Sequence, residues 1–199
     1  MMDINFSACA VFSEETGVKT MLDIEKLINK AMEAGFTHAA KLDAATIHLL
    51  DAVRDMCSAD RCGKYGKNWS CPPGCGSIEE CRRQVAGYKR GILVQTVGEL
   101  DDPFDYEGMM AAEKKHKDNF VRLCDELAGE FPGMLALGAG SCTRCRECSY
   151  PDAPCRQPDK RISSMEAYGM MVMDVCRDNG LKYNYGSDKV AFTGCFLLE

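Results

Sequence analysis

Thirteen cysteines in 199 residues constrain this chain more than any other feature of its sequence. Two stretches, residues 57–75 and 142–155, hold eight of them among glycine, proline and charged residues. Stretches of this kind have too few apolar side chains to keep a shape alone. Cross-links or bound metal must therefore supply part of their folding free energy.

The second stretch has Cys142, Cys145 and Cys148 at two-residue intervals and Cys155 six residues further on. Two-residue spacing lets a tight loop turn successive thiolates toward one point. Zinc sites commonly take one such pair from each of two separated turns, whereas three in one loop are typical of a [4Fe–4S] cluster. In the ferredoxin run the fourth cysteine follows after three residues and precedes a proline. Here Pro154 comes before Cys155, so its place as fourth ligand stays open.

The first stretch has the spacing Cys-x4-Cys-x8-Cys-x3-Cys, and its glycines and prolines predict a loop of defined shape. Trp69 and Tyr65 within it would keep water from a cluster. Cys81 follows in a predicted helix, residues 77–88, and ranks below Cys75 as the fourth ligand. The expected ligands of the two metal sites are Cys57, Cys62, Cys71, Cys75, Cys142, Cys145, Cys148 and Cys155.

A disulfide framework is the alternative, but an odd cysteine count does not favour it. The first residues lack a basic segment and a long apolar stretch, and no apolar run approaches the ~20 residues that span a bilayer. We therefore expect a cytoplasmic protein, in a compartment that keeps thiols reduced. The net charge of -6 argues against nucleic acid or an anionic membrane as a partner.

Apolar periodicity predicts an α/β or α+β fold, with residues 1–199 as a single cysteine-rich metal-binding domain of one sheet and flanking helices. Cys124 and Cys176 fall on apolar helix faces and are expected in the core, whereas Cys9 and Cys195 have no assigned role. The expected helices cover residues 20–35, 47–57, 77–88, 106–131 and 163–180, and the expected strands cover 37–44, 91–97, 133–142 and 189–199.

Two finer expectations concern single residues. Ser163 and Glu166 have the spacing of a capping box and would begin the helix of residues 163–180. His116 is expected on the solvent-rich middle of the long helix, and like the other histidines it is assigned a structural rather than a catalytic role.

Three segments resemble a known family: "CGKYGKNWSCPP", "GILVQ" and "CTRCRECSYPDAPCRQPDKRISSMEAYGMMV". They are similar to the predicted metal-binding proteins known as domain of unknown function 2284, from about residue 20 to the end. The resemblance implies metal binding through Cys57, Cys62, Cys71, Cys142, Cys145, Cys148 and Cys155. It places less weight on Cys75 and Cys81, which implies a first site with three cysteines and an open or non-cysteine fourth position.

The sequence thus predicts a protein with two [4Fe–4S] clusters that transfers electrons to or from a redox partner protein. One alternative is a redox enzyme that binds substrate at an open iron of the first cluster. Another is a zinc protein in which both sites are structural and the chain serves as an interaction module. Cations in both stretches would offset the negative charge of thiolate-bound clusters; they are Arg61, Lys64, Lys67, Arg144, Arg146 and Arg156.

Overall fold

The β-branched run near residue 91 belongs to the second strand of a five-stranded mixed sheet in the computed structural model, which describes residues 22–198. The strand order is β1-β2-β5-β3-β4, with β3 and β4 parallel and the other neighbours antiparallel. The strands are β1 (His38–Asp43), β2 (Arg90–Glu99), β3 (Leu135–Gly138), β4 (Ser163–Ser164) and β5 (Lys189–Leu197). The α-helices are α1 (Ile24–Glu33), α2 (Asp51–Met56), α3 (Ile78–Val85), α4 (Tyr106–Ala128) and α5 (Val172–Asp178). The fold is therefore α+β, and Cys9 lies outside the described residues.

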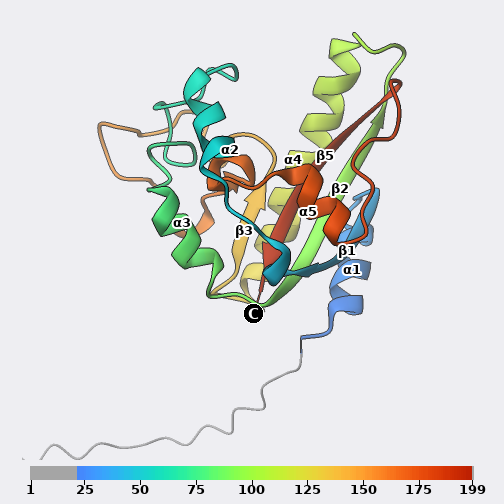
Figure 1. Ribbon diagram of the computed structural model, residues 1–199, viewed down its shortest axis with the longest axis horizontal. Coiled ribbons are helices and arrows are strands. Elements are labelled where there is room, and N and C mark those ends of the chain that lie inside the picture. Colours follow the sequence, from blue (N-terminus) through green and yellow to red (C-terminus); the bar gives the residue numbers. More distant parts are fainter. Residues whose placement is uncertain (1–21, 199) are drawn as a thin grey trace, which may run out of the picture.

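Successive side chains of β2 and β5 point to opposite faces of the sheet, and this alternation gives the interior two cores. Ile92 and Val94 face one side with Phe196, and α1 and α4 cover that side (Figure 1). Leu93 and Cys195 face the other side, where α3 and α5 pack. Because both faces of the sheet are covered, its inner strands are apolar on both sides, as the run at residues 91–97 predicted.

Local sequence signals set the ends of several helices. Asp23 caps α1 by accepting a hydrogen bond from the amide of Lys26, and Asp105 caps α4 through the amide of Gly108. A complete capping box begins α3, where Ser77 and Glu80 each accept from the other's backbone amide. Among the described helices, none combines the length and apolar character needed to cross a membrane.

The prediction for residues 163–180 was wrong at its start. Ser163 lies in β4, paired with Leu137 of β3, and the helix begins only at Val172. Gly169 has φ +89°, a left-handed conformation that ends the short 3₁₀ turn before it. Ser164 accepts from the amide of Ala167, so a serine does order this turn, but without a capping box.

His116 was also misplaced by the sequence, because it is fully buried. Its Nδ1 lies 3.1 Å from the hydroxyl oxygen of Thr96 on β2, and its Nε2 has no hydrogen-bond partner among the described residues. Phe36 meets the imidazole ring edge-on, and the ring of Phe120 lies tilted against it. Burial, with a smaller effect of the Lys117 charge, lowers the pKa of His116 to about 4. The imidazole is therefore neutral in the folded protein at neutral pH.

We predict that His116 makes the protein less stable in acid. The unfolded chain binds a proton near pH 6.5 and the folded protein only near pH 4, so the stability present above pH 6.5 is lost as the pH falls toward 4. The loss from this one group is roughly 3 kcal/mol. Urea unfolding at pH 7 and pH 4.5 should show a smaller difference in His116→Gln than in the wild type. The exposed His48→Gln should retain the wild-type difference.

Candidate metal centre

Four predicted ligands from the second stretch line a single cavity of about 280 Å³: Cys142, Cys145, Cys148 and Cys155. The loop that carries them leaves the end of β3 through Gly140, whose φ of +71° is left-handed. The three cysteines at two-residue spacing and the more distant Cys155 thus line the same space.

Hydrogen bonds between the side chains and backbone of this loop give it its shape. Gln157 donates from Nε2 to the carbonyl of Arg144 at 3.1 Å and to the sulfur of Cys145 at 3.5 Å. Arg156 donates to the carbonyl of Glu147 at 2.7 Å, and Ser149 to that of Pro154 at 2.7 Å. Few apolar contacts are involved, so the loop depends on these polar ones.

The same cavity is lined by cations, and one of them is buried. Arg144 has a side chain only 7% exposed; it donates to Asp125 at 2.8 Å and to the carbonyl of Lys160 at 3.0 Å. Its third nitrogen, Nη2, is buried with no hydrogen-bond partner among the described residues. The guanidinium also lies beside Cys124 of α4, where it opposes the rise that burial gives to the pKa of that thiol. The other cations that line the cavity are Lys64, Lys67, Arg146 and Arg161.

Two features fix the shape of the first stretch: the hydrogen bonds of the Asp60 carboxylate and the close approach of the backbone at Gly74 to that at Asn68. Asp60, which has φ +47°, accepts from the amide of Tyr65 at 2.9 Å and from Lys67 at 3.3 Å. A Cβ at Gly74 would stand 2.5 Å from the carbonyl oxygen of Asn68, so only glycine fits there without a shift. The loop therefore turns back on itself, as its glycines and prolines predicted.

This turn brings the cysteines of the first stretch near one another. Burial raises the pKa of Cys57, and the thiols of Cys71 and Cys62 add to the rise. The pKa of Cys71 is likewise raised, first by burial, although hydrogen bonds from Asn68 and Ser70 oppose it. Metal binding at these thiols would release protons, because thiolates are the ligands. Cys62 is exposed, whereas Cys71 is buried.

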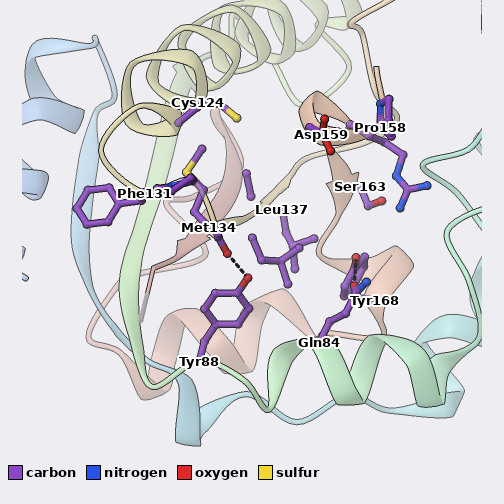
Figure 2. A pocket seen from close by; sticks show the side chains of 16 residues that line it. Gln84, Tyr88, Cys124, Phe131, Met134, Leu137, Pro158, Asp159, Ser163 and Tyr168 are labelled. Atoms are coloured by element: carbon purple, nitrogen blue, oxygen red, sulfur yellow. Dashed lines mark hydrogen bonds between the residues drawn. The ribbon is translucent and has the colours of Figure 1, made fainter. Parts of the chain in front are cut away.

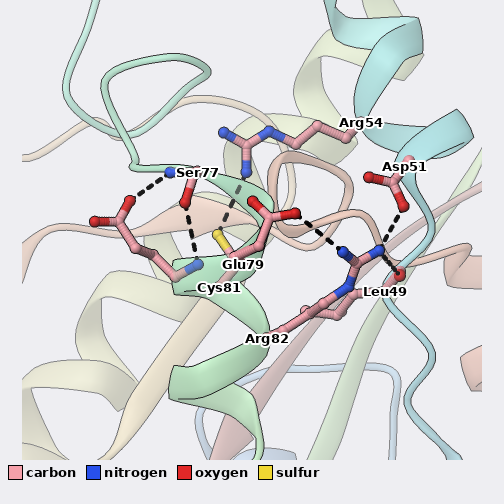
Figure 3. A network of polar contacts seen from close by, with 8 residues as sticks. Leu49, Asp51, Arg54, Ser77, Glu79, Cys81 and Arg82 are labelled. Carbon is pink, nitrogen blue, oxygen red and sulfur yellow. Dashed lines mark hydrogen bonds and ion pairs between the residues drawn. The ribbon is translucent and has the colours of Figure 1, made fainter.

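Cys75 is paired with Cys81, the residue that the sequence ranked below it. The Cys75 thiol donates to the carbonyl of Ala167 at 3.8 Å, and the interaction of the two thiols, more than burial, raises the pKa of Cys75 and lowers that of Cys81. Arg54 of α2 donates to the sulfur of Cys81 at 3.4 Å and also to the carbonyl of Gly76 (Figure 3). Cys81 is fully buried on α3. Both sulfurs therefore remain candidates for the fourth position of the first site.

A single hydroxyl joins the two cysteine stretches. Ser70 Oγ accepts from the amide of Cys142 at 3.0 Å and lies 4.0 Å from the sulfur of Cys71. Asn68 Oδ1 accepts from both the amide and the hydroxyl of Ser70, at 3.0 Å and 2.6 Å. Ser70 is 1% exposed. One ordered, buried side chain thus contacts a candidate ligand of each site.

Trp69 makes the second contact between the stretches. Its indole nitrogen donates to the carbonyl of Ala153 at 3.0 Å, and its ring meets Tyr150 edge-on at 4.9 Å. Trp69 lines the cavity of the second stretch. The aromatic shielding predicted for the first site is therefore directed at the second, and the two loops lie side by side at one end of the sheet (Figure 1).

The remaining described cysteines belong to the interior. Cys176 and Cys195 are fully buried in one core and Cys124 is buried in the other, which confirms the core prediction for Cys124 and Cys176. Cys124 borders a separate cavity of about 400 Å³ (Figure 2). There Tyr88 donates to the carbonyl of Gly133 and Tyr168 to Gln84. No other described cysteine lines that cavity, so it has no second thiol to share a metal.

Within residues 22–198, no group of three or more His, Cys, Asp or Glu side chains has an arrangement that could hold a metal ion.

Four residues that contact candidate ligands or line the second cavity were not predicted from the sequence: Arg54, Ser70, Gln157 and Arg161. Two of these carried a usable signal: Ser70 directly precedes Cys71, and Gln157 follows Cys155 by two residues. Arg54 and Arg161 carried none, because their contacts depend on how distant segments pack.

The model of a family described as predicted metal-binding protein (DUF2284) matches residues 40–198. The chain belongs to this family. The matched range covers every candidate ligand of both stretches, together with Arg54, Ser70 and Gln157. No curated protein and no solved structure matches the chain.

We predict that loop cysteines and core cysteines differ in their effect on metal content. Cys71→Ser and Cys145→Ser should lose metal and lower the thermal midpoint, because each site contributes to the folding of its loop. Cys124→Ala and Cys176→Ala should keep full metal content at a cost of about 1 to 2 kcal/mol, as small core truncations. Metal per chain and thermal midpoint test all four. Loss of metal in the core pair alone would contradict the ligand assignment.

Proposed function

We propose that this protein carries two [4Fe–4S] clusters and transfers electrons to or from a redox partner protein in the cytoplasm. The observation that carries the proposal is the cavity of the second stretch, which is lined by four thiols, the largely buried Arg144 and four further cations. At about 280 Å³ the cavity exceeds the need of one ion, since a water molecule in the liquid takes about 30 Å³. The same thiols suit iron–sulfur and zinc chemistry, so the choice of cluster is part of the proposal.

Local charge supports a redox role. The chain has a net charge of -6, yet the cavity is lined by five cations and one carboxylate, Glu147. A cluster held by four thiolates carries negative charge and gains more upon reduction. Cations at its edge therefore favour the reduced state, and the ion pair of Arg144 with Asp125 already balances part of the charge of that cation.

The contact between the stretches supports transfer within the protein. When bound, such clusters supply one-electron chemistry at low potential. Ser70 holds Cys71 and Cys142 on either side of one hydroxyl, and Trp69 with Tyr150 limits water between the loops. The protein thus keeps the two sites close and in a fixed relation.

A redox enzyme is the second candidate, on the evidence of Cys62. This candidate ligand is exposed, so the first site is reachable from solvent. The second stretch is more enclosed by Trp69 and by the cations that line its cavity. In this variant of the proposal the second site passes electrons to the first, where substrate binds.

We predict about eight irons and eight acid-labile sulfides per chain in anaerobically purified protein, since each cubane holds four of each. The protein should be brown and should bleach on reduction. Stoichiometric zinc without sulfide, in protein never exposed to air, would instead support the structural zinc site. Metal and sulfide analysis with a visible spectrum makes the distinction.

We predict that Ser70→Ala weakens the coupling of the two sites while leaving both occupied. The change removes the acceptor of the Cys142 amide and one partner of Asn68, at a cost of about 1 to 3 kcal/mol. Electron paramagnetic resonance of the fully reduced protein should show a weaker spin–spin interaction between the clusters, and at least one midpoint potential should shift. Ser163→Ala, a buried serine on β4, should match the wild type. Equal spectra for all three proteins would exclude the proposed role of Ser70.

A further inference from the structure

A cavity of about 430 Å³ lies on the other side of the first cysteine stretch, between α2 and the start of α5. Its volume falls in the range of small-molecule sites, roughly 300 to 1,000 Å³. It is distinct from the cavity of the second stretch, with which it shares no lining residue. Cys57 and Cys62 lie in its wall, so a bound molecule would contact two candidate ligands of the first site.

Exposed apolar side chains gather at this cavity from three separate segments. Met56 ends α2 and is 68% exposed, Met173 of α5 is 49% exposed, and Tyr183 from the segment before β5 is 43% exposed. Large apolar side chains left in water at one concave place mark a binding surface rather than a core. Methionine suits such a place because its flexible thioether adapts to different shapes.

The charges in the wall select against an ionic ligand. Arg61 and Glu166 line the cavity, one of each sign, and neither forms an ion pair with a described residue. The Glu166 carboxylate lies close enough to Cys57 and Tyr183 to raise the pKa of each, after the larger effect of burial. With one cation and one carboxylate, these two side chains give the wall no net charge to attract an ion, and apart from Cys57, Cys62 and Tyr183 the other lining residues are valines and methionines.

We propose that this cavity binds a small, uncharged, mainly apolar molecule and holds it against Cys57 and Cys62. The proposal rests on the proposed function only in making those two residues metal ligands; the apolar site itself does not depend on metal. If the protein is the redox enzyme of the second candidate function, such molecules would be its class of substrate. The molecule would enter past Met56 and Met173, the most exposed of the large apolar residues in the wall.

The test measures binding of an uncharged apolar dye, Nile red, to the anaerobically purified full chain, and its displacement by primary alcohols from butanol to octanol. Affinity for the alcohols should rise about three- to fourfold with each added methylene, because each is transferred from water into an apolar wall. Met173→Glu and Met56→Glu should each weaken dye binding at least tenfold. Both side chains are exposed, so neither variant should lower the thermal midpoint or the metal content.

The matched control is Met32→Glu, which alters a methionine of comparable exposure (43%) on α1, away from the cavity. It should bind the dye within about twofold of the wild type, by the same area argument. An affinity independent of alcohol length, or equal loss in the control, would overturn the proposal. So would a wild-type dimer that Met173→Glu converts to a monomer, because a second copy would then occupy the cavity.

Contact with the cysteines has its own readout. Octanol should change the visible spectrum of the metal-loaded protein, or, if the thiols prove free of metal, should slow alkylation of Cys62 by N-ethylmaleimide. Absence of iron with length-dependent alcohol binding would reject the clusters and retain the cavity. Iron at both sites with no alcohol binding would reject the cavity and retain the clusters.

Discussion

The hydrogen bond from the Cys142 amide to the hydroxyl of Ser70 is the contact on which the candidate centre depends. Both cysteine stretches are poor in apolar residues, so neither is held by the cores on either side of the sheet. Asn68 fixes the hydroxyl from one side, and the sulfur of Cys71 lies on another. Because Ser70 is buried, water does not compete for these hydrogen bonds, and each is electrostatically stronger than it would be at the surface.

The sheet supports this arrangement from outside it. Its two cores contain Cys124, Cys176 and Cys195, which have no candidate metal role, and also Cys81, whereas the other candidate ligands lie on the two loops. A rigid scaffold with functional residues on its loops is a common division of labour. The same arrangement gives this region a local charge opposite to that of the whole chain. The chain has a net negative charge, yet Arg144, Arg146 and Arg161 line the cavity that holds the four cysteines. The apolar cavity beside Cys57 and Cys62 adds a neutral surface on the opposite side of the first loop.

Sequence periodicity predicted most of the elements, and its failures have physical causes. The long helix, the strand around residue 91 and the last strand appear where expected, because each has enough apolar residues at a single period. The prediction of a helix over residues 163–180 was wrong at its start, because Ser163 pairs with β3 instead of beginning the helix with a capping box. The prediction that His116 is exposed was wrong because its neighbours in sequence are charged, whereas its neighbours in space are Thr96 and aromatic rings.

The sequence by itself determined where the cysteines of this protein lie: eight candidate thiol ligands fall in two stretches, at spacings that suit metal, within a family of predicted metal-binding proteins. Spacing constrains which sulfurs of one loop can meet, since a few residues have limited reach. Only the tertiary structure decided what lies between and around them. It placed Ser70 between the two stretches, Arg54 against Cys81, and Arg144 at the second cavity. Those contacts join residues that are distant in sequence, and packing of the helices and loops around the sheet, rather than any local pattern, brings them together.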